Sequence, residues 1–456
     1  MAATEIDNDK STVGHQEEPA PLKIGNEKAA DDNAAALEGQ DLDFTEEENK
    51  RILRKIDLRI LPLAAIACGL QYVDKAGLGA ASIYGLIEDL NLEGQEYSWA
   101  ASIFYFGNLL GSIFAGRVLQ YFHVGKTLGV AFFAWGITLL GCIGAKNFAT
   151  LAAMRFLLGL LESVLVPGLL FITTMWYTHR EQPARLGLWT FMNGLLPIPF
   201  ILVFWALGNV TSGPLKPWQL IFLLLGLISC GYGVILWFFL PDSPTSVKWL
   251  TPREKAVAVE RIAREQTGIK NKEFKWGQAR EAFKDIHVYL IFAAMFFAQV
   301  SGSVQTNFLG LIIRGFGYGP LTTQLLTIPN YAVQTVVVLC VSFPPTFIKS
   351  CRNMKIPITV CATIVAVIGV ILLYVTPPEI QYQSRRLASV IILSFATANY
   401  NVIMSVIGAN IGGFTKKQVT TSVTFFFYCL INIICPQTFL KSEAPRYPTG
   451  MKFVIA

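Results

Sequence analysis

Long apolar stretches, separated by short polar ones, run through most of this 456-residue chain. A helix needs about 20 mostly apolar residues to cross the ~30 Å hydrocarbon core of a bilayer. Stretches that meet this requirement lie near 60–80, 97–118, 127–145, 149–176, 186–208, 218–240, 287–309, 321–345, 356–376, 386–410 and 419–440. The pattern therefore predicts an all-α membrane protein with eleven transmembrane helices.

The composition agrees with a chain that is solvated largely by lipid. Apolar residues make up 53% of the chain and charged residues 15%, whereas about a quarter of the residues of a soluble domain are charged. These values exclude a single soluble domain, a disordered chain and a disulfide scaffold. The eight cysteines form no CxxC pair, and the HExxH, GxSxG and GxxxxGK[ST] motifs are absent. We therefore expect no metal site, no cofactor, no enzyme and no nucleic-acid partner.

The basic residues indicate an orientation, because cytoplasmic connections of membrane proteins are enriched in lysine and arginine. If the amino terminus is cytoplasmic, the inner connections hold 23 basic residues and the outer ones hold seven. The sequence therefore predicts a cytoplasmic amino terminus, and we expect a multi-pass protein of the plasma membrane. The one Asn-X-Ser/Thr sequon begins at Asn209 and would lie outside, so Asn209 is a predicted glycosylation site.

Polar segments divide the chain into four parts. Residues 1–57 are expected to form a disordered cytoplasmic tail and pre-helix, because they lack an apolar signal core. Residues 58–240 hold six of the apolar stretches, and residues 286–456 hold the other five and a short stub. Residues 241–285 form a basic loop with an amphipathic helix at 251–266. This layout is typical of a two-bundle secondary transporter; a helical membrane anchor without transport is the alternative.

Five segments carry a resemblance to a known family. RFLLGLLESVLVPGLLFITTMWYTHREQPAR (155–185) is similar to the fourth span and following loop of the anion:cation symporter family within the major facilitator superfamily, especially its fungal allantoate-permease branch. YVDKAGLG (72–79), FLPDSPTSVKWLTPREKAVAVER (239–261), NIGGFTKK (410–417) and PQTFLKSEAPRYPTG (436–450) match in order and spacing. The resemblance covers roughly residues 50–456. It implies the major facilitator two-bundle fold, here with eleven complete helices and the twelfth missing or truncated.

Four ionisable residues lie well inside the apolar stretches: Asp74, Lys75, Arg155 and Glu162. A charge at that depth costs a few kcal/mol unless it faces a cavity or a partner, so each is a functional candidate. Two cations among so few charges indicate a site for an anion. Arg155 and Glu162 are about 10 Å apart along one helix and cannot form a simple ion pair. A substrate carboxylate at Arg155 and a proton on Glu162 would satisfy both; polar groups of neighbouring helices are the alternative.

The resemblance bears on these residues as well. The family's fourth-span arginine and glutamate, which match Arg155 and Glu162, are implicated in substrate binding and cation coupling. We expect Lys75 to face the central cavity and Asp74 to be the partner of another helix. The family usually carries Asp-Arg followed by Asn here, whereas this chain has Lys75 and then Gly77. A lysine lacks the bidentate fork of an arginine, which indicates an altered choice of substrate.

Further residues complete the expected site. Tyr331 and Asn410 match family positions and are predicted to bind substrate. Glu181 and Arg185, which follow the fourth span, are predicted to act as helix partners or gating residues at the membrane interface.

Together these features predict a monomeric, proton-coupled symporter that moves a small organic anion by alternating access. The anion would be a monocarboxylate, a vitamin-like compound or a ureide. Lys75 and Arg155 would hold the anion, and Glu162 would carry the coupling proton. An exporter of an acidic metabolite, a transport-inactive nutrient sensor and a truncated relative are the alternatives with the same fold.

Overall fold

A computed structural model describes residues 44–178, 181–210, 212–265, 275–342, 355–377, 379–412, 414–444 and 447–455. Within these ranges the chain is helical and contains no β-strand. Eleven helical segments are long and apolar enough to cross a bilayer, and ten of them begin and end within six residues of a predicted stretch. The predicted all-α membrane fold with eleven spans is therefore confirmed.

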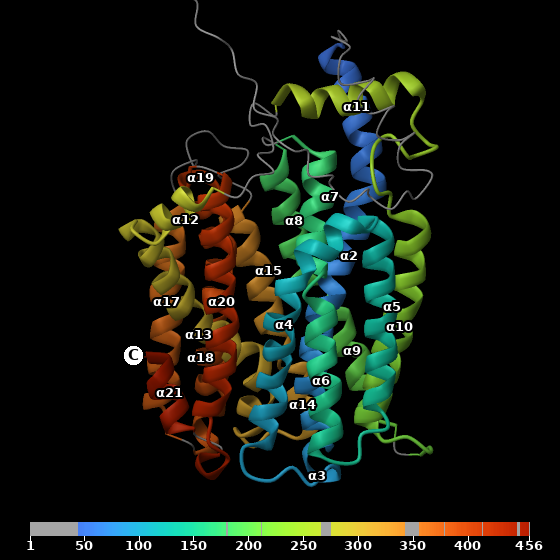
Figure 1. Cartoon of the computed structure of the whole chain (residues 1–456). Helices are drawn as coiled ribbons and strands as arrows, with labels where there is room; N and C mark the ends of the chain where they lie inside the picture. The colour runs from blue at the N-terminus through green and yellow to red at the C-terminus, as the bar shows by residue number, and fades with distance from the viewer. Residues whose placement is uncertain are drawn as a thin grey trace, which may run out of the picture.

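The first half of the chain supplies six spans (Figure 1). Two of them are interrupted: α6 (Phe148–Glu162) and α7 (Leu165–Trp176) form the fourth span, and α8 (Gln182–Leu195) and α9 (Pro197–Gly208) form the fifth. The others are α2 (Glu46–Ile83), α4 (Glu96–Tyr121), α5 (Val124–Cys142) and α10 (Pro217–Phe239), with the short α3 (Leu86–Asp89) after the first.

The second half supplies five spans, after a connection that holds α11 (Pro252–Glu265) and α12 (Trp276–Ala282). The spans are α13 (Ile286–Arg314), α14 (Pro320–Leu325) with α15 (Ile328–Ser342), α17 (Lys355–Val375), α18 (Gln383–Leu393) with η3 (Ser394–Ala398) and α19 (Asn399–Asn410), and α20 (Phe414–Thr438). The short η2 (Ile380–Tyr382) precedes α18, and η4 (Lys441–Glu443) and α21 (Pro448–Ile455) follow α20.

The first helix begins at Glu46, whereas the apolar pattern predicts a start at 60. The side chain of Thr45 caps it by accepting a hydrogen bond from the backbone N–H of Glu48 at 3.2 Å. Ile52, Ile56 and Ile60 recur every fourth residue on one face of this extension and are buried. Hydropathy marks only the part of a helix that lies in lipid, so it misses this polar extension. Residues 1–43 of the predicted tail lie outside the described residues.

The spans run side by side through the molecule, and α11 lies across one end of it (Figure 1). We call this end, which also carries α12, the α11 end, and the opposite end, which carries α3, the α3 end. Three helix pairs make the most extensive contacts between the halves of the chain: α2 with α13, α4 with α20, and α8 with α15. Both halves therefore contribute to one central interface.

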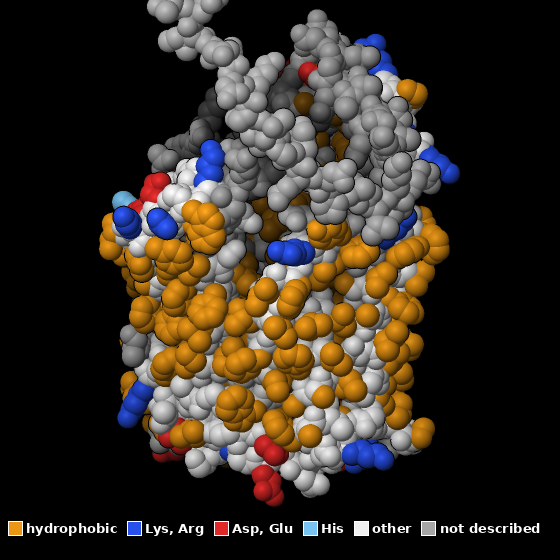
Figure 2. Space-filling view, in the orientation of Figure 1, with side chains coloured by type: hydrophobic (Ala, Val, Ile, Leu, Met, Phe, Trp, Pro, Cys, Tyr) orange, Lys and Arg blue, Asp and Glu red, His pale blue; other side chains and the backbone are white. Residues whose placement is uncertain are grey.

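A band of hydrophobic side chains covers the middle of the visible face, and charged side chains gather above and below it (Figure 2). Large apolar side chains on the surface include Phe114, Ile137 and Ile364, each more than half exposed. An exposed apolar surface of this extent is expected where lipid, in place of water, is the solvent.

The fourth span is interrupted at its midpoint, directly after Glu162. Pro167 lacks an amide hydrogen, and in a continuous helix its ring would clash with the carbonyl of Ser163, four residues earlier. The chain therefore ends α6 at Glu162 and begins α7 at Leu165. The interruption places a helix end beside the carboxylate of Glu162.

The helices α4 and α6 pack against each other through two glycines. A Cβ on Gly159 would lie 1.8 Å from the carbonyl oxygen of Phe104, and a Cβ on Gly107 would lie 2.1 Å from that of Phe156. Only glycine permits such an approach of two backbones, as small residues do in many membrane helix pairs. The contact fixes Phe104 against the helix that carries Arg155.

Gly107→Val is expected to push α4 and α6 apart, because overpacking a close contact costs about 1–3 kcal/mol or more. Gly116→Val on the same helix is the matched control, since a Cβ there would have open space around it. We expect the Tm of the purified protein in detergent to fall for Gly107→Val and to stay close to wild type for Gly116→Val. Equal Tm values for the two variants would contradict this packing.

Candidate functional site

The four ionisable residues of the spans lie together inside the first half of the molecule. Asp74 and Lys75 of α2 face Arg155 and Glu162 of α6, and we call these four residues the charge cluster. Their relative exposures are 1% for Asp74, 9% for Lys75, 2% for Arg155 and 2% for Glu162. Ionised groups withdrawn from water to this degree are stable only when opposite charges or hydrogen bonds oppose them.

Lys75 and Glu162 form the tighter pair of the charge cluster. The Lys75 ammonium lies 2.7 Å from Oε1 of Glu162, and the same oxygen accepts a hydrogen bond from Nε2 of Gln71 at 2.5 Å. Gln71 precedes Lys75 by four residues and so lies on the same face of α2. The other carboxylate oxygen, Oε2 of Glu162, has no hydrogen-bond partner in the described part of the chain. One oxygen of the glutamate is therefore held by two partners, and the other is buried without a hydrogen-bond partner among the described residues.

Arg155 and Asp74 form the looser pair. Nη1 of Arg155 lies 3.9 Å from Oδ2 of Asp74, which is beyond hydrogen-bonding distance. Nε and Nη1 of Arg155 and both carboxylate oxygens of Asp74 lack a hydrogen-bond partner among the described residues. These atoms are buried, so the pair leaves hydrogen-bonding capacity of both groups unfilled inside the protein. Arg155 therefore keeps donors that a carboxylate could occupy.

The aromatic ring of Phe104, on α4, lies beside both cations. Cζ of Arg155 lies 4.9 Å from the ring centroid, and Nζ of Lys75 lies 5.6 Å from it. Each cation is close enough to be attracted by the ring quadrupole. The ring holds the two cations near each other without neutralising either one.

The structure provides partners that the sequence does not reveal. Seven-residue spacing excludes an ion pair between Arg155 and Glu162 on their own helix, and each instead meets a residue of α2. Gln71 could have been found from its spacing to Lys75. Phe104 could not, because it lies in an apolar stretch of a different helix and nothing local distinguishes it.

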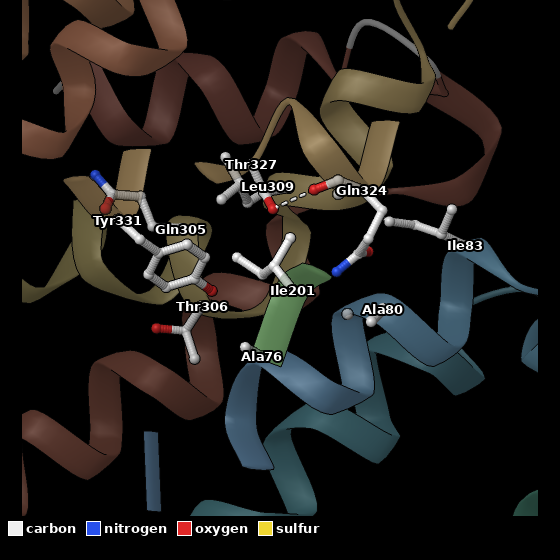
Figure 3. A pocket seen from close by; sticks show the side chains of 12 residues that line it. Ala76, Ala80, Ile83, Ile201, Gln305, Thr306, Leu309, Gln324, Thr327 and Tyr331 are labelled. Atoms are coloured by element: carbon white, nitrogen blue, oxygen red, sulfur yellow. Dashed lines mark hydrogen bonds between the residues drawn. The ribbon is translucent and has the colours of Figure 1, made fainter. Parts of the chain in front are cut away.

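Tyr331 lies at the end of the central interface that is closed in this structure. Its ring is buried and meets that of Tyr72 edge to face, with the centroids 6.4 Å apart. It lines a cavity with residues of both halves, among them Ala76 of α2 and Gln305 of α13 (Figure 3). The cavity has a volume of about 20 Å³, which is room for about one water molecule.

Polar contacts between the halves seal the α3 end. Hydrogen bonds between described residues that cross there include those from Tyr97 Oη to the carbonyl of Asn307 at 2.9 Å, from Arg314 Nη1 to that of Ile83 at 3.0 Å, and from Lys441 Nζ to that of Leu92 at 2.7 Å. In addition, a Cβ on Gly310 of α13 would lie 2.5 Å from Cδ1 of Ile83 of α2, so small residues allow close packing.

The ion pairs of the α11 end are arranged differently. Nη2 of Arg185 lies 2.8 Å from Oδ2 of Asp57, and Glu181 pairs with Arg261 of α11. The first pair joins the extension of α2 to α8, and the second joins α11 to the residue just before α8. Glu181 and Arg185 thus lie in one cluster, at the position where the sequence predicts helix partners or gating residues.

The second half has its own ion pairs at the α11 end. Nζ of Lys416 lies 2.8 Å from Oε1 of Glu281 and 2.8 Å from Oδ2 of Asp285. The hydrogen bond from Lys416 lowers the pKa of Asp285 to about 2. In the described residues, the ion pairs named at this end stay within one half, whereas the contacts at the α3 end join the two halves.

Two further predicted residues, Asn410 and Asn209, also lie away from the charge cluster. Asn410 is exposed at the last residue of α19, so its role in substrate binding stays a prediction. Asn209 is exposed just after α9, and its Nδ2 donates to the carbonyl of Trp205 at 2.7 Å. The hydroxyl residue of its sequon, Thr211, lies outside the described residues.

One buried cation lies at the first residue of the predicted stretch near 386–410. The helix α18 begins at Gln383, so Arg386 lies inside it. Its side chain is 4% exposed, and its guanidinium lies 4.2 Å from the ring centroid of Phe316. Its flanking polar residues lower the local hydropathy, which explains why the apolar pattern starts this span too late.

Comparison with known sequences places the chain among transporters. A model of the Major Facilitator Superfamily matches residues 64–436. The chain is 32% identical to an uncharacterized transporter of Schizosaccharomyces pombe, over 92% of this chain and 78% of the relative. It is 30% identical to the allantoate permease of Saccharomyces cerevisiae, over 90% of this chain and 77% of the permease. It is also 30% identical to the thiamine pathway transporter of the same yeast, over 96% and 84% of the two chains.

Solved structures agree on the fold. The xylose transporter XylE of E. coli, in a partially occluded inward-open conformation, aligns with a TM-score of 0.62 over 87% of this chain and 95% of its own, at 13% identity. A bacterial homologue of the human lysosomal transporter Spinster, inward-facing and unoccupied, aligns with a TM-score of 0.59 over 87% and 82%, at 15% identity. The chain belongs to the Major Facilitator Superfamily, in the branch of fungal transporters related to allantoate permease.

Proposed function

We propose that this transporter is a proton-coupled symporter that carries a small organic anion by alternating access. The observation that carries the proposal is the charge cluster, in which two cations are opposed by two carboxylates and part of the hydrogen-bonding capacity is unfilled. Such groups within a membrane span usually mark the path of a substrate or a proton.

Charge balance within the membrane supplies the coupling. With Lys75 and Arg155 protonated and Asp74 and Glu162 ionised, the charge cluster is neutral. A monocarboxylate that enters the site adds one negative charge, and a proton that binds with it cancels that charge. Because an unbalanced buried charge costs several kcal/mol, the site favours anion and proton together over either one alone.

The two ion pairs suggest different tasks for the two cations. Arg155 has free donors on Nε and Nη1 and can accept a carboxylate without first losing a partner. Lys75 is held by Glu162 at 2.7 Å, so it becomes available to an anion only when Glu162 takes up a proton. Glu162 is therefore the proposed proton carrier, and Asp74, which accepts no hydrogen bond from the described residues, is the second carboxyl that could take a proton.

The conformation supports alternating access. The halves are joined by hydrogen bonds at the α3 end, whereas the named ion pairs of the α11 end act within each half. The halves can therefore separate at the α11 end without breaking those pairs. With a cytoplasmic amino terminus, as the basic residues favour, this arrangement corresponds to an inward-facing state. Glu181 and Arg185 would keep α11 and the first half moving as one body.

Proton coupling can be measured in proteoliposomes that contain the purified chain and a pH-sensitive dye. We expect external allantoate, or another monocarboxylate that the transporter accepts, to acidify the lumen, because a proton enters with the anion. Glu162→Gln cannot carry that proton, so its acidification should fall to the level of protein-free vesicles. Acidification by Glu162→Gln at the wild-type rate would refute the role of Glu162. Asp74→Asn is the comparison, and a loss in that variant alone would assign the proton to Asp74.

The contribution of the Lys75–Glu162 pair to stability can be measured independently of transport. Lys75→Met should lower the Tm in detergent, because it leaves a buried carboxylate without its partner, at a cost of about 3–5 kcal/mol. The double variant Lys75→Met with Glu162→Gln removes both charges and should recover most of the lost Tm. Neither variant should take up the anion. If the double variant is no more stable than Lys75→Met, the pair does not contribute in the way described.

Glycosylation tests the proposed orientation, with the amino terminus in the cytoplasm of a plasma-membrane protein. When the chain is expressed in yeast, endoglycosidase treatment should increase the gel mobility of wild type and leave that of Asn209→Gln unchanged. An amino-terminal tag should resist protease in intact cells. A tag that is cleaved in intact cells, together with no effect of endoglycosidase, would reverse the orientation.

A further inference from the structure

Five tyrosines from five helices lie at the interface between the halves; four of them lie within electrostatic range of the charge cluster, and Tyr331 contacts one of these four, Tyr72. Tyr72 of α2 and Tyr105 of α4 belong to the first half, and Tyr331 of α15, Tyr400 of α19 and Tyr428 of α20 belong to the second. Tyr72 and Tyr105 lie within electrostatic range of the Lys75 ammonium, and so does Tyr400. The one cation that is paired with Glu162 is thus also bordered by aromatic rings.

The rings form two separate series of contacts across the interface between the halves. The centroids of Tyr105 and Tyr428 are 6.1 Å apart, and those of Tyr428 and Tyr400 are 5.3 Å apart. Tyr72 meets Tyr331 at 6.4 Å, with the ring planes at 88°. Each series brings rings of the two halves into contact. We call the five residues the tyrosine arc.

The hydroxyl groups of the tyrosine arc are unoccupied. None of the five forms a hydrogen bond within the described part of the chain, and none is among the fully buried polar atoms that lack a partner. Their oxygens therefore reach accessible space, unlike the buried and unpartnered hydroxyl oxygens of Tyr84 and Tyr177. Tyr72, Tyr400 and Tyr428 are only half-buried although they lie between helices. Tyr105 and Tyr331 are buried in the core, and Tyr72 and Tyr428 pack against it, so packing holds these rings while their hydroxyl oxygens stay accessible.

We propose that the tyrosine arc selects an anion with a flat, conjugated body, such as an aromatic or heteroaromatic monocarboxylate with polar ring substituents. The carboxylate would lie at Lys75 and Arg155, and the ring would lie between tyrosines of the two halves. Aromatic pairs gain from offset and edge-to-face contacts that a saturated ring cannot make. The free hydroxyls can donate to or accept from polar groups on the edge of the ligand. This inference rests on the proposed function and names its class of substrate.

Binding to the purified full chain tests the inference without interference from passive leakage of weak acids through lipid. The two probes are 4-hydroxybenzoate and trans-4-hydroxycyclohexanecarboxylate, which share a carboxylate and a hydroxyl group and differ in the flatness of the ring. Isothermal titration at pH 6 gives the Kd of each. One aromatic contact is worth about two- to tenfold in affinity, so we expect wild type to bind the aromatic acid at least about fivefold more tightly.

Three variants locate the source of that preference. Tyr428→Leu removes a ring of the tyrosine arc and should bring the Kd ratio close to one, whereas Tyr428→Phe keeps the ring and should retain most of the ratio. Tyr289→Leu is the matched control, because Tyr289 lies on α13 outside the arc and is 48% exposed; its ratio should equal that of wild type. The Tm of each variant without ligand confirms that it is folded.

The outcomes separate this inference from the proposed function. A wild-type ratio near one, or a ratio that Tyr428→Leu leaves unchanged, would overturn the role of the tyrosine arc. So would a failure of both acids to bind a chain that transports allantoate with protons. If no acid binds and no monocarboxylate drives proton entry in proteoliposomes, the proposed function is wrong as well.

Discussion

Two cations and two carboxylates lie where a bilayer would have hydrocarbon, and each one is tolerated because a group on a facing helix opposes its charge. The neighbouring residues of the central structure keep these four charges next to one another. Lys75 and Asp74 share α2 with Gln71, Arg155 and Glu162 share α6, and the ring of Phe104 borders both cations. Changing the charge of any member requires a compensating change elsewhere, which is the physical basis of the proposed coupling between anion and proton.

The helices around the charge cluster combine close packing with local freedom. Gly107 and Gly159 bring the backbones of α4 and α6 into contact and so fix Phe104 and Arg155 relative to each other. Two turns beyond Arg155, the same span is interrupted next to Glu162, with Pro167 preventing a continuous helix. One cation is thus held rigidly, while the carboxylate proposed to exchange a proton lies at a helix end.

Much of the fold could be predicted from the sequence because lipid imposes a simple requirement on the length and polarity of a span. The starts of α2 at Glu46 and of α18 at Gln383 could not be predicted, since both depend on polar residues that continue a helix beyond its apolar core. The four members of the charge cluster could also be found, because any charge inside a span stands out. Their pairing, the ring of Phe104 and the tyrosine arc could not, because contacts between helices depend on packing that no local pattern records. Asn410, chosen for its match to a family position, lies exposed at the end of α19.

The proposed balance of charge predicts how the rate of transport depends on the membrane potential. If one proton enters with each monocarboxylate, no net charge crosses the membrane. Proteoliposomes loaded with potassium and treated with valinomycin allow the membrane potential to be set while the pH gradient is held constant. The initial rate of uptake of labelled allantoate, or of another accepted monocarboxylate, should then be the same at inside-negative and inside-positive potentials. A rate that rises with an inside-positive potential would show that the anion moves without its proton and would contradict the neutral site.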